Sequence, residues 1–189
     1  APRRSAKAIE GLRRVGVPDE LYDSVITSGE VLFEFIRCQE GLKTYTENWN
    51  LKPETSKYII IGPERDAGLL DGTDYTRVME TKDAEFMIVT GFDNDESTME
   101  EKQHYLDEAI KLNLPLICAN PDLVVVRQTG QRALCAGVIA KKYFDMGGQV
   151  TWFGKPHGQV YHHTMQLAGN PPKSRVAAIG DSLIMDILG

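Results

Sequence analysis

Short runs of β-branched residues alternate with helical patterns in this chain, and this alternation limits its fold more than any other feature. The runs KYIIIG (57–62), EFMIVTG (85–91) and LPLICANPD (114–122) are typical of buried strands that end at glycine, proline or polar residues. Residues 97–113 lie between the second and third runs and carry apolar side chains at helical spacing. A repeated strand-helix-strand order predicts an α/β protein with mostly parallel strands.

The alternation continues toward both ends. Thr27 and Glu30 have the spacing of a capping box, which predicts where one helix begins. We expect a second capping box at Ser97 and Glu100. The other expected elements are a helix over 4–17, a short strand and helix within 22–39, a loop over 45–56, a helix over 131–148, a strand over 149–154, a helix over 157–169 and a strand over 174–181.

Composition excludes several classes of partner. The 21 basic and 27 acidic residues give a net charge of -6, and no Lys/Arg block marks a nucleic-acid surface. No apolar run is long enough to cross a membrane, and the first residues lack the apolar centre of a signal peptide. Cys38, Cys118 and Cys135 are widely spaced and odd in number, which favours reduced, buried thiols and a cytoplasmic protein.

Two charged residues, Lys155 and Asp181, directly follow predicted strands, where open parallel sheets bind their ligands. Lys155 lies between one strand and the start of the next helix, a place where a cation meets an anionic ligand. Asp181 comes directly after the apolar run 174–180, and Asp186 follows five residues later. The simpler interpretation of each is a solvated lysine and a helix N-cap worth roughly 1 kcal/mol. Their order and shared position at strand ends make a joint site the more specific hypothesis.

Other motifs fail on inspection. The stretch 93–104 begins like a calcium loop but has Thr98 where glycine is needed and His104 where a bidentate glutamate is needed. The run after residue 57 has one glycine where a dinucleotide fingerprint needs three. His162 and His163 are adjacent on a predicted helix and point to different faces, which favours a surface role.

The segments FGKPHG (153–158) and AAIGDSLIMDILG (177–189) resemble motifs III and IV of the haloacid dehalogenase superfamily, class IIA phosphatases. ICANPD (117–122) is similar to the family's Asn-Pro-Asp segment, and ALCAGVIAKKY (133–143) resembles its helix leading back to the core. The resemblance implies a Rossmann-like parallel core, incomplete in this chain, over residues 1–54 and 147–189. It implies an inserted α/β cap of the C2 type over residues 55–146.

The resemblance also implies roles for individual residues. Asp181 matches the carboxylate that ligates Mg²⁺, and Lys155 matches the catalytic lysine that neutralises the phosphoryl group and the nucleophile. Ser182 matches a residue that contacts substrate or metal-bound water, and Asp186 a supporting catalytic acid. In that family an aspartate attacks the phosphate ester and gives an aspartyl-phosphate that water hydrolyses. The implied activity is hydrolysis of a small phosphate monoester such as a sugar phosphate or nucleotide.

The chain departs from the family at motif I, the Asp-x-Asp-Gly segment that supplies the nucleophile and general acid. The nearest candidate, GLLDGTDYT (68–76), has Leu69 in place of the nucleophile and no strand before it. We therefore expect motif I, and motif II with it, to lie outside this chain. A non-catalytic relative that binds a phosphorylated ligand is the alternative function.

The predicted cap sets the choice of ester. Asn120 and Asp122 match a loop that faces the active site in the family, so the resemblance implies that they bind a polar leaving group such as a sugar. An Asn-Pro-Asp turn with side-chain capping explains the same residues equally well. Apart from the ester we expect no nucleic-acid or membrane partner, and homo-oligomerisation stays open.

Overall fold

The computed structural model of the chain describes residues 1–38, 56–127 and 129–187. The expected loop over 45–56 and the 54/55 domain boundary lie almost wholly outside these residues. The described elements are α1 (Ser5–Arg14), η1 (Asp19–Leu21), α2 (Ser28–Arg37), β1 (Lys57–Ile61), η2 (Glu64–Asp66), β2 (Thr76–Arg77), η3 (Thr81–Asp83), β3 (Phe86–Val89), α4 (Met99–Leu112), β4 (Leu116–Cys118), β5 (Val124–Val126), β6 (Arg132–Leu134), α5 (Ala136–Asp145), β7 (Val150–Trp152), α6 (Gly158–Leu167), η4 (Lys173–Arg175) and η5 (Leu183–Ile187).

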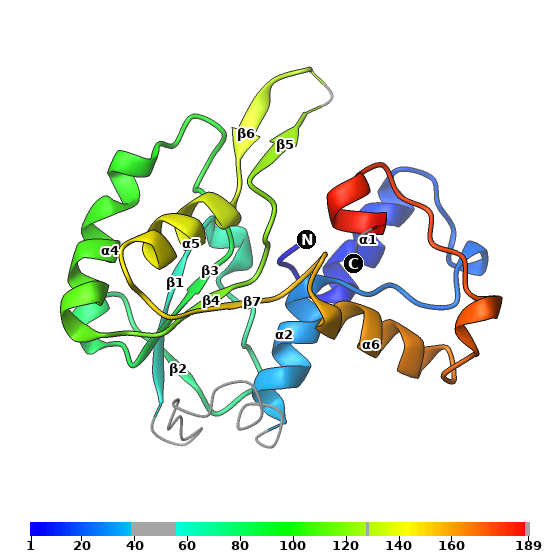
Figure 1. Cartoon of the computed structure of the whole chain (residues 1–189), viewed down its shortest axis with the longest axis horizontal. Coiled ribbons are helices and arrows are strands. Elements are labelled where there is room, and N and C mark those ends of the chain that lie inside the picture. Colours follow the sequence, from blue (N-terminus) through cyan, green and yellow to red (C-terminus); the bar gives the residue numbers. More distant parts are fainter. Residues whose placement is uncertain (39–55, 128, 188–189) are drawn as a thin grey trace.

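A five-stranded parallel sheet in the order β2-β1-β3-β4-β7 organises the molecule (Figure 1). Ile60 of β1 lies opposite Ile88 of β3, and Ile117 of β4 lies between Ile88 and Thr151 of β7. All pairings in this sheet are parallel, so the carboxyl ends of its strands share one edge. The expected α/β fold with a parallel sheet is therefore confirmed.

The two faces of the sheet bury different side chains because successive strand residues point to opposite faces. One face carries Met87 and Val89 and packs against buried residues of α4 and α5, among them Leu106 and Tyr143. The other face carries Phe86 and Ile88 and packs against α2 through residues that include Leu32 and Ile36. The sheet is thus a buried middle layer, which explains why its strands are continuously apolar.

The N-terminal segment is fastened to the start of α2. Arg4 makes two hydrogen bonds to the Glu30 carboxylate, at 2.9 and 3.0 Å, and its guanidinium lies 3.3 Å from the centre of the Phe33 ring. Thr27 Oγ1 donates to the carbonyl of Arg3 at 2.6 Å, and Ser28 Oγ donates to that of Ala1 at 2.8 Å. These contacts fix the backbone of residues 1–4 beside the sheet.

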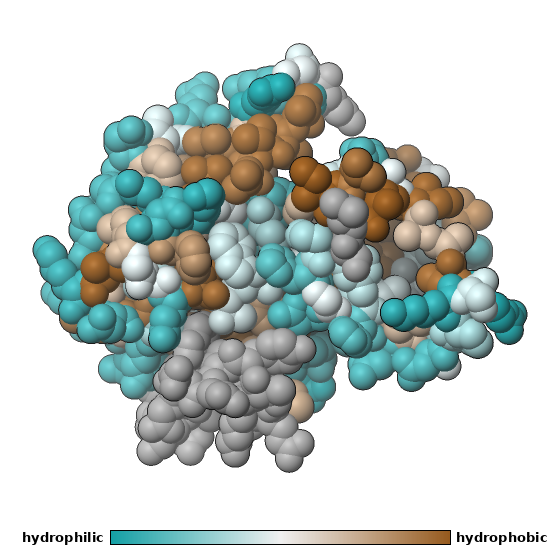
Figure 2. All heavy atoms as spheres, in the orientation of Figure 1, coloured by the Kyte–Doolittle hydropathy of each residue, from teal (hydrophilic) through white to brown (hydrophobic). Residues whose placement is uncertain are grey.

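Helices α1 and α6 and the turn η5 lie together on the side of α2 away from α4 and α5, and the β5–β6 hairpin projects from the sheet (Figure 1). The hairpin exposes apolar side chains, with Val126 at 63%. Figure 2 shows apolar surface both over this hairpin and over the C-terminal residues that face it across a hollow.

The predicted strand over 174–181 is wrong. Residues 173–175 form the 3-10 turn η4, and the described residues that follow up to Asp181 form neither helix nor strand. Ile179 is 98% exposed. A strand needs a neighbour whose backbone groups pair with its own. The described residues outside the five-stranded sheet and the β5–β6 hairpin contain no strand to supply one.

The predictions for the helix caps and for the cysteines are confirmed in some details and wrong in others. Thr27 Oγ1 accepts from the Glu30 N–H at 3.0 Å as predicted, whereas the Glu30 carboxylate binds Arg4 and the Ser5 N–H and does not complete the box. The second helix cap is Thr98, one residue after the expected Ser97. The thiols are free, but only Cys118 is fully buried and Cys38 is exposed, so the prediction of three buried thiols is wrong for Cys38.

The predicted domain division is not resolved by these contacts. β7 lies after the expected 146/147 boundary, yet it pairs with β4 in the same sheet as the strands of the expected cap. Helix α2, assigned to the core, packs on that sheet as well. The division into core and cap stays a prediction. None of the helices among the described residues has the length and apolar character needed to span a membrane.

Candidate functional site

The carboxyl edge of the sheet gathers four loops that carry polar residues. Residues 62–66 follow β1, residues 90–95 follow β3, residues 119–122 follow β4, and residues 153–155 follow β7. Open parallel sheets bind ligands beyond this edge because the loops there converge while the strands hold them in place. The candidate site therefore lies beyond the carboxyl ends of β1, β3, β4 and β7.

Lys155 reaches this edge through a glycine turn after β7. Gly154 has a φ of 112°, and a Cβ at this position would lie 2.8 Å from Pro121 Cδ and 3.1 Å from Ser28 Cβ. Only glycine combines this backbone conformation with so close an approach. Gly154 therefore packs against both the loop after β4 and the start of α2, and Lys155 follows it directly in the chain.

Three of the residues that the resemblance singled out, Lys155, Asp186 and Ser182, form one connected group. The Lys155 ammonium donates to Asp186 Oδ1. The Ser182 N–H donates to Asp186 Oδ2 at 3.0 Å, and Ser182 Oγ accepts from the Met185 N–H at 3.2 Å. Tyr161 of α6 donates to the carbonyl of Met185 at 2.8 Å, which anchors the same turn. Asp186 thus holds Lys155 in position.

The charges in this group favour each other. The hydrogen bond from Lys155, with help from the Ser182 N–H, lowers the pKa of Asp186 below its usual range. The same hydrogen bond raises the pKa of Lys155, against a smaller opposing effect of desolvation. The Lys155 side chain is still 49% exposed. A permanently charged ammonium is therefore open to an anionic ligand.

Asn120 and Asp122 lie on the loop after β4 and line a cavity of about 260 Å³. The loop packs on the start of α5, where a Cβ on Gly137 would lie 2.2 Å from the Pro121 carbonyl oxygen. The Asp122 charge acts on Lys155 and raises its pKa further. The structure thus brings this loop near the turn that carries Lys155, and a role of Asn120 and Asp122 in binding stays a prediction.

The carboxylate of Asp181 is not bonded to this group, although the Asp181 N–H helps to lower the pKa of Asp186. Asp181 does not follow a buried strand, because residues 174–181 form none, and its side chain is exposed. No hydrogen bond or ion pair of its carboxylate is found within residues 1–38, 56–127 and 129–187, where no group of three or more His, Cys, Asp or Glu residues is placed to hold a metal ion. A free carboxylate suits Mg²⁺, which is often held by one or two carboxylates together with water and phosphate oxygens.

The family of this chain is identified by a relative among the solved structures. Neither the protein-family models nor the curated proteins gave a match. The crystal structure of a haloacid dehalogenase-like family hydrolase from Brucella suis 1330 shares 32% identity at a TM-score of 0.80, covering 99% of this chain and 67% of that one. The chain belongs to the haloacid dehalogenase-like family of hydrolases.

More distant members of the fold match over the same extent. A p-nitrophenyl phosphatase from Archaeoglobus fulgidus has 21% identity and a TM-score of 0.71, covering 98% of this chain and 64% of that one. A glycerol phosphate phosphatase from Mycobacterium tuberculosis, solved with calcium, has 16% identity and a TM-score of 0.67, covering 98% of this chain and 50% of that one. The chain thus spans one half to about two thirds of these family structures.

Several polar residues at the carboxyl edge of this haloacid dehalogenase-like sheet were not predicted from the sequence. Arg3, Arg65, Asp66 and Thr90 line the same cavity as Asn120 and Asp122. Arg65 and Asp66 follow β1, and Thr90 follows β3. The rule that singled out Lys155 and Asp181, polar residues just after apolar runs, applies equally to these three. Arg3 gave no such signal, because contacts with α2 bring it to the site.

Proposed function

We propose that the protein containing this chain is a Mg²⁺-dependent phosphomonoesterase that acts on a small ester such as a sugar phosphate or nucleotide. The observation that carries the proposal is Lys155, a charged and half-exposed ammonium fixed by Asp186 at the ligand-binding edge of the sheet. Membership of a hydrolase family and the phosphatases among its structural neighbours support the reaction class.

In this proposal each residue has a distinct task. Lys155 binds a phosphoryl oxygen and offsets the negative charge that grows during transfer. Asp186 orients the ammonium of Lys155 and keeps it protonated, which is the supporting role expected for this acid. Ser182 supplies the N–H that orients Asp186. Asp181 would hold Mg²⁺, which neutralises phosphoryl charge when bound.

The nucleophile is assigned outside residues 1–189, because no Asp-x-Asp-Gly segment occurs in this sequence. The chain's own contribution is to bind and neutralise the phosphoryl group with Lys155 and to select the ester. Asn120 and Asp122 are proposed to bind the leaving group, because both line the cavity beside Lys155. We place this selection in the proposed cap and expect a cytoplasmic enzyme.

The test is hydrolysis of 4-nitrophenyl phosphate by the full-length protein with and without added Mg²⁺. Asp181→Asn should lower kcat/KM by about a hundredfold or more, the scale on which charge stabilisation contributes to transfer. Asp74→Asn, which removes another exposed carboxylate, is the matched control and should retain activity. Activity of Asp181→Asn equal to that of the control would refute the metal assignment.

Complete absence of turnover in the unmodified full-length protein would refute the proposed phosphomonoesterase activity. Binding of phosphorylated compounds without turnover would then favour the alternative, a non-catalytic member of the family.

A further inference from the structure

The cavity at the carboxyl edge is built from segments that are far apart in the sequence. The N-terminal segment and the loops after β1, β3 and β4 all contribute residues to its walls. It continues into a wider, open hollow of about 670 Å³ that shares Arg3, Arg65 and Arg127 with it. The inner cavity is near the lower end of the size range of small-molecule sites.

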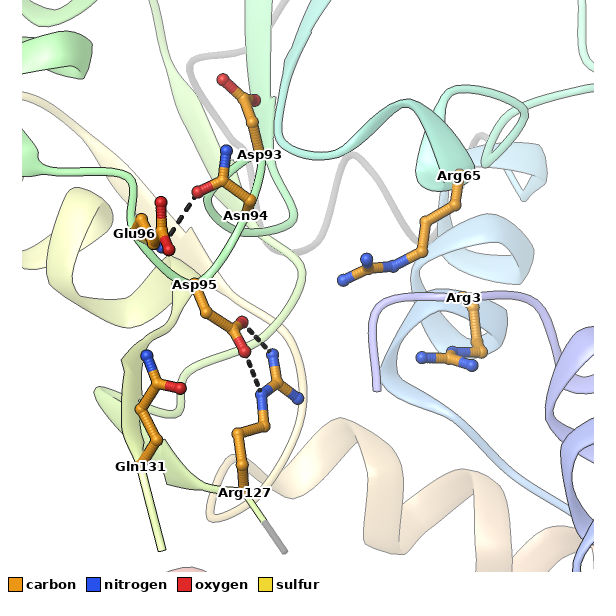
Figure 3. A pocket seen from close by; sticks show the side chains of 8 residues that line it. All are labelled: Arg3, Arg65, Asp93, Asn94, Asp95, Glu96, Arg127 and Gln131. Atoms are coloured by element: carbon orange, nitrogen blue, oxygen red, sulfur yellow. Dashed lines mark hydrogen bonds and ion pairs between the residues drawn. The ribbon is translucent and has the colours of Figure 1, made fainter. Parts of the chain in front are cut away.

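Two arginines enter this space without a carboxylate partner. Figure 3 shows the side chains of Arg3 and Arg65 extending from neighbouring segments toward the same hollow. Neither guanidinium has an ion pair or hydrogen bond among the described residues. Arginine is suited to bind carboxylate and phosphate oxygens because its planar group offers several donors in a fixed arrangement.

The acidic residues drawn across the hollow form no ion pair with these arginines, although the charge of Arg65 acts on Asp95. Asp95 accepts two hydrogen bonds from Arg127, at 2.8 and 2.5 Å, and Asp93 accepts one from Lys102 at 2.5 Å. Figure 3 shows the bonded Asp95 and Arg127 on the wall opposite Arg3 and Arg65. Glu96 lines the wider hollow but not the inner cavity. Asp93 and Asp95 are thus paired with other cations, and Asp66 and Asp122 line the inner cavity together with the two arginines.

The inner wall offers polar atoms that lack a partner. Asp66 is 4% exposed, and its Oδ2 atom is buried with no hydrogen bond. Thr90 Oγ1 is also buried, and its hydroxyl acts as a hydrogen-bond donor that lowers the pKa of the Asp66 carboxyl. Asp66 and Thr90 thus give the cavity wall a polar patch that suits a hydroxyl group of a ligand.

The cavity is also connected to the candidate phosphoryl site. Gly154, the residue before Lys155, packs against Pro121, and the flanking Asn120 and Asp122 line the cavity. The loop after β4 therefore joins the cavity to the turn that carries Lys155. A ligand whose phosphoryl group lies at Lys155 extends naturally toward Arg3 and Arg65.

We propose that Arg3 and Arg65 form an anion-binding subsite for the leaving group, so that the preferred substrate is a phosphate ester bearing a second anionic group, either carboxylate or phosphate. Asp66 and Thr90 receive a hydroxyl group of the same ligand. This inference deepens the proposed function and depends on it for the identity of the leaving group, whereas binding of an anion to the subsite does not.

Anion binding is tested without turnover, by isothermal titration calorimetry of the full-length protein. A Lys155→Gln background removes the candidate phosphoryl cation, and malonate and inorganic phosphate serve as the carboxylate and phosphate probes. Arg3→Gln combined with Arg65→Gln should raise the Kd of the tighter probe about tenfold or more, as expected when charge-assisted hydrogen bonds are lost. Arg14→Gln, on an exposed face of α1, is the matched control.

The probe that binds more tightly identifies the anion as carboxylate or phosphate. An unchanged Kd in the double variant for both probes would overturn the subsite, as would an absence of binding in the Lys155→Gln protein. Circular dichroism and Tm of each variant show whether it is folded. Arg65→Lys, which keeps the charge but not the planar group, should give an intermediate Kd.

The link to catalysis is tested with phenyl phosphate and 4-carboxyphenyl phosphate, which differ only in the second anion. The fall in kcat/KM caused by Arg65→Gln should be about tenfold larger for the carboxylated ester. Equal falls for both esters would overturn the substrate class. No hydrolysis of either ester by the unmodified protein would refute the proposed function, while the calorimetry would still decide the subsite.

Discussion

The ammonium of Lys155 donates to the carboxylate of Asp186 and so joins the turn after β7 to η5, 31 residues later in the chain. Two positions that share no secondary structure are thereby fixed together. The contact also makes the ionisation of each group depend on the other, which leads to a direct test.

Removing the lysine should change the titration of its partner. Lys155→Gln should move the pKa of Asp186 up toward the ordinary value of an aspartate, because the largest cause of its lowering is lost. Carboxyl carbon NMR against pH measures this shift, with Lys141→Gln, which releases the exposed Asp145, as the control. A pKa of Asp186 that is equally low in both variants would contradict the assigned cause.

The same pair has a defined pH window. Because the folded pKa of Asp186 lies below its unfolded value, the pair's contribution to stability is fully present above the unfolded pKa. It is lost as the pH falls through the folded pKa. We therefore expect Lys155→Gln to lower Tm at neutral pH and to have little effect on Tm well below the folded pKa of Asp186. Thermal unfolding across that pH range measures this.

Asp66 should behave in the opposite sense. Burial raises the pKa of Asp66, although Arg65, Thr90, Arg3 and Lys7 all act to lower it. Its native state holds a proton more tightly than the unfolded chain, so stability falls as the pH rises through this interval. Asp66→Asn should then raise Tm at pH 7 by about 2 °C or more, the shift that roughly 1 kcal/mol gives in a chain of this size.

The control for Asp66 is the measurement at low pH. Below the unfolded pKa, Asp66 is protonated in both the folded and the unfolded state. The variant and the native chain should then unfold at nearly the same temperature. A lower Tm of Asp66→Asn at pH 7 would show that the carboxylate is stabilised by its surroundings and would contradict the dominance of burial.

Helix α4 offers two leucines for a matched test of packing. Leu106 is 0% exposed against the sheet, and Leu112 is 45% exposed at the helix end. Leu106→Ala should lower the free energy of unfolding by about 2–5 kcal/mol through lost burial and a cavity. Leu112→Ala should change it by roughly 0.5 kcal/mol or less. Urea titrations of both variants would contradict the described packing if the two losses were equal.

The thiols should differ sharply in reactivity. Burial raises the pKa of Cys118 to about 12, so almost no thiolate forms at pH 8, whereas Cys38 is exposed. Maleimide should modify Cys38 in the folded protein and reach Cys118 only after unfolding. Peptide mass mapping of samples labelled with and without urea measures this. Rapid labelling of Cys118 in the folded state would show that β4 opens locally.

Sequence patterns correctly predicted the elements that can be identified from their own residues, without knowing which segments pair with them. The runs at β1, β3 and β4 are buried on both faces, so their continuous apolar character was sufficient. Residues 174–181 have the same local character but form no strand, because pairing depends on another segment. The strand-end rule singled out Lys155 and Asp181, and the family resemblance added Ser182 and Asp186, of which the structure joins Ser182 and Asp186 to Lys155. Arg3 depends on contacts of residues 1–4 with α2 that no local pattern reveals.

The strand order of the sheet has a consequence for the length of any molecule that binds at its edge. Lys155 follows β7 and Arg65 follows β1, and three strand intervals of about 4.8 Å, or about 14 Å in total, separate those two strands. The two long side chains shorten that gap from either end. A single ligand that contacts both residues must therefore carry its two charges well apart, and a ligand with one charge can contact only one of them.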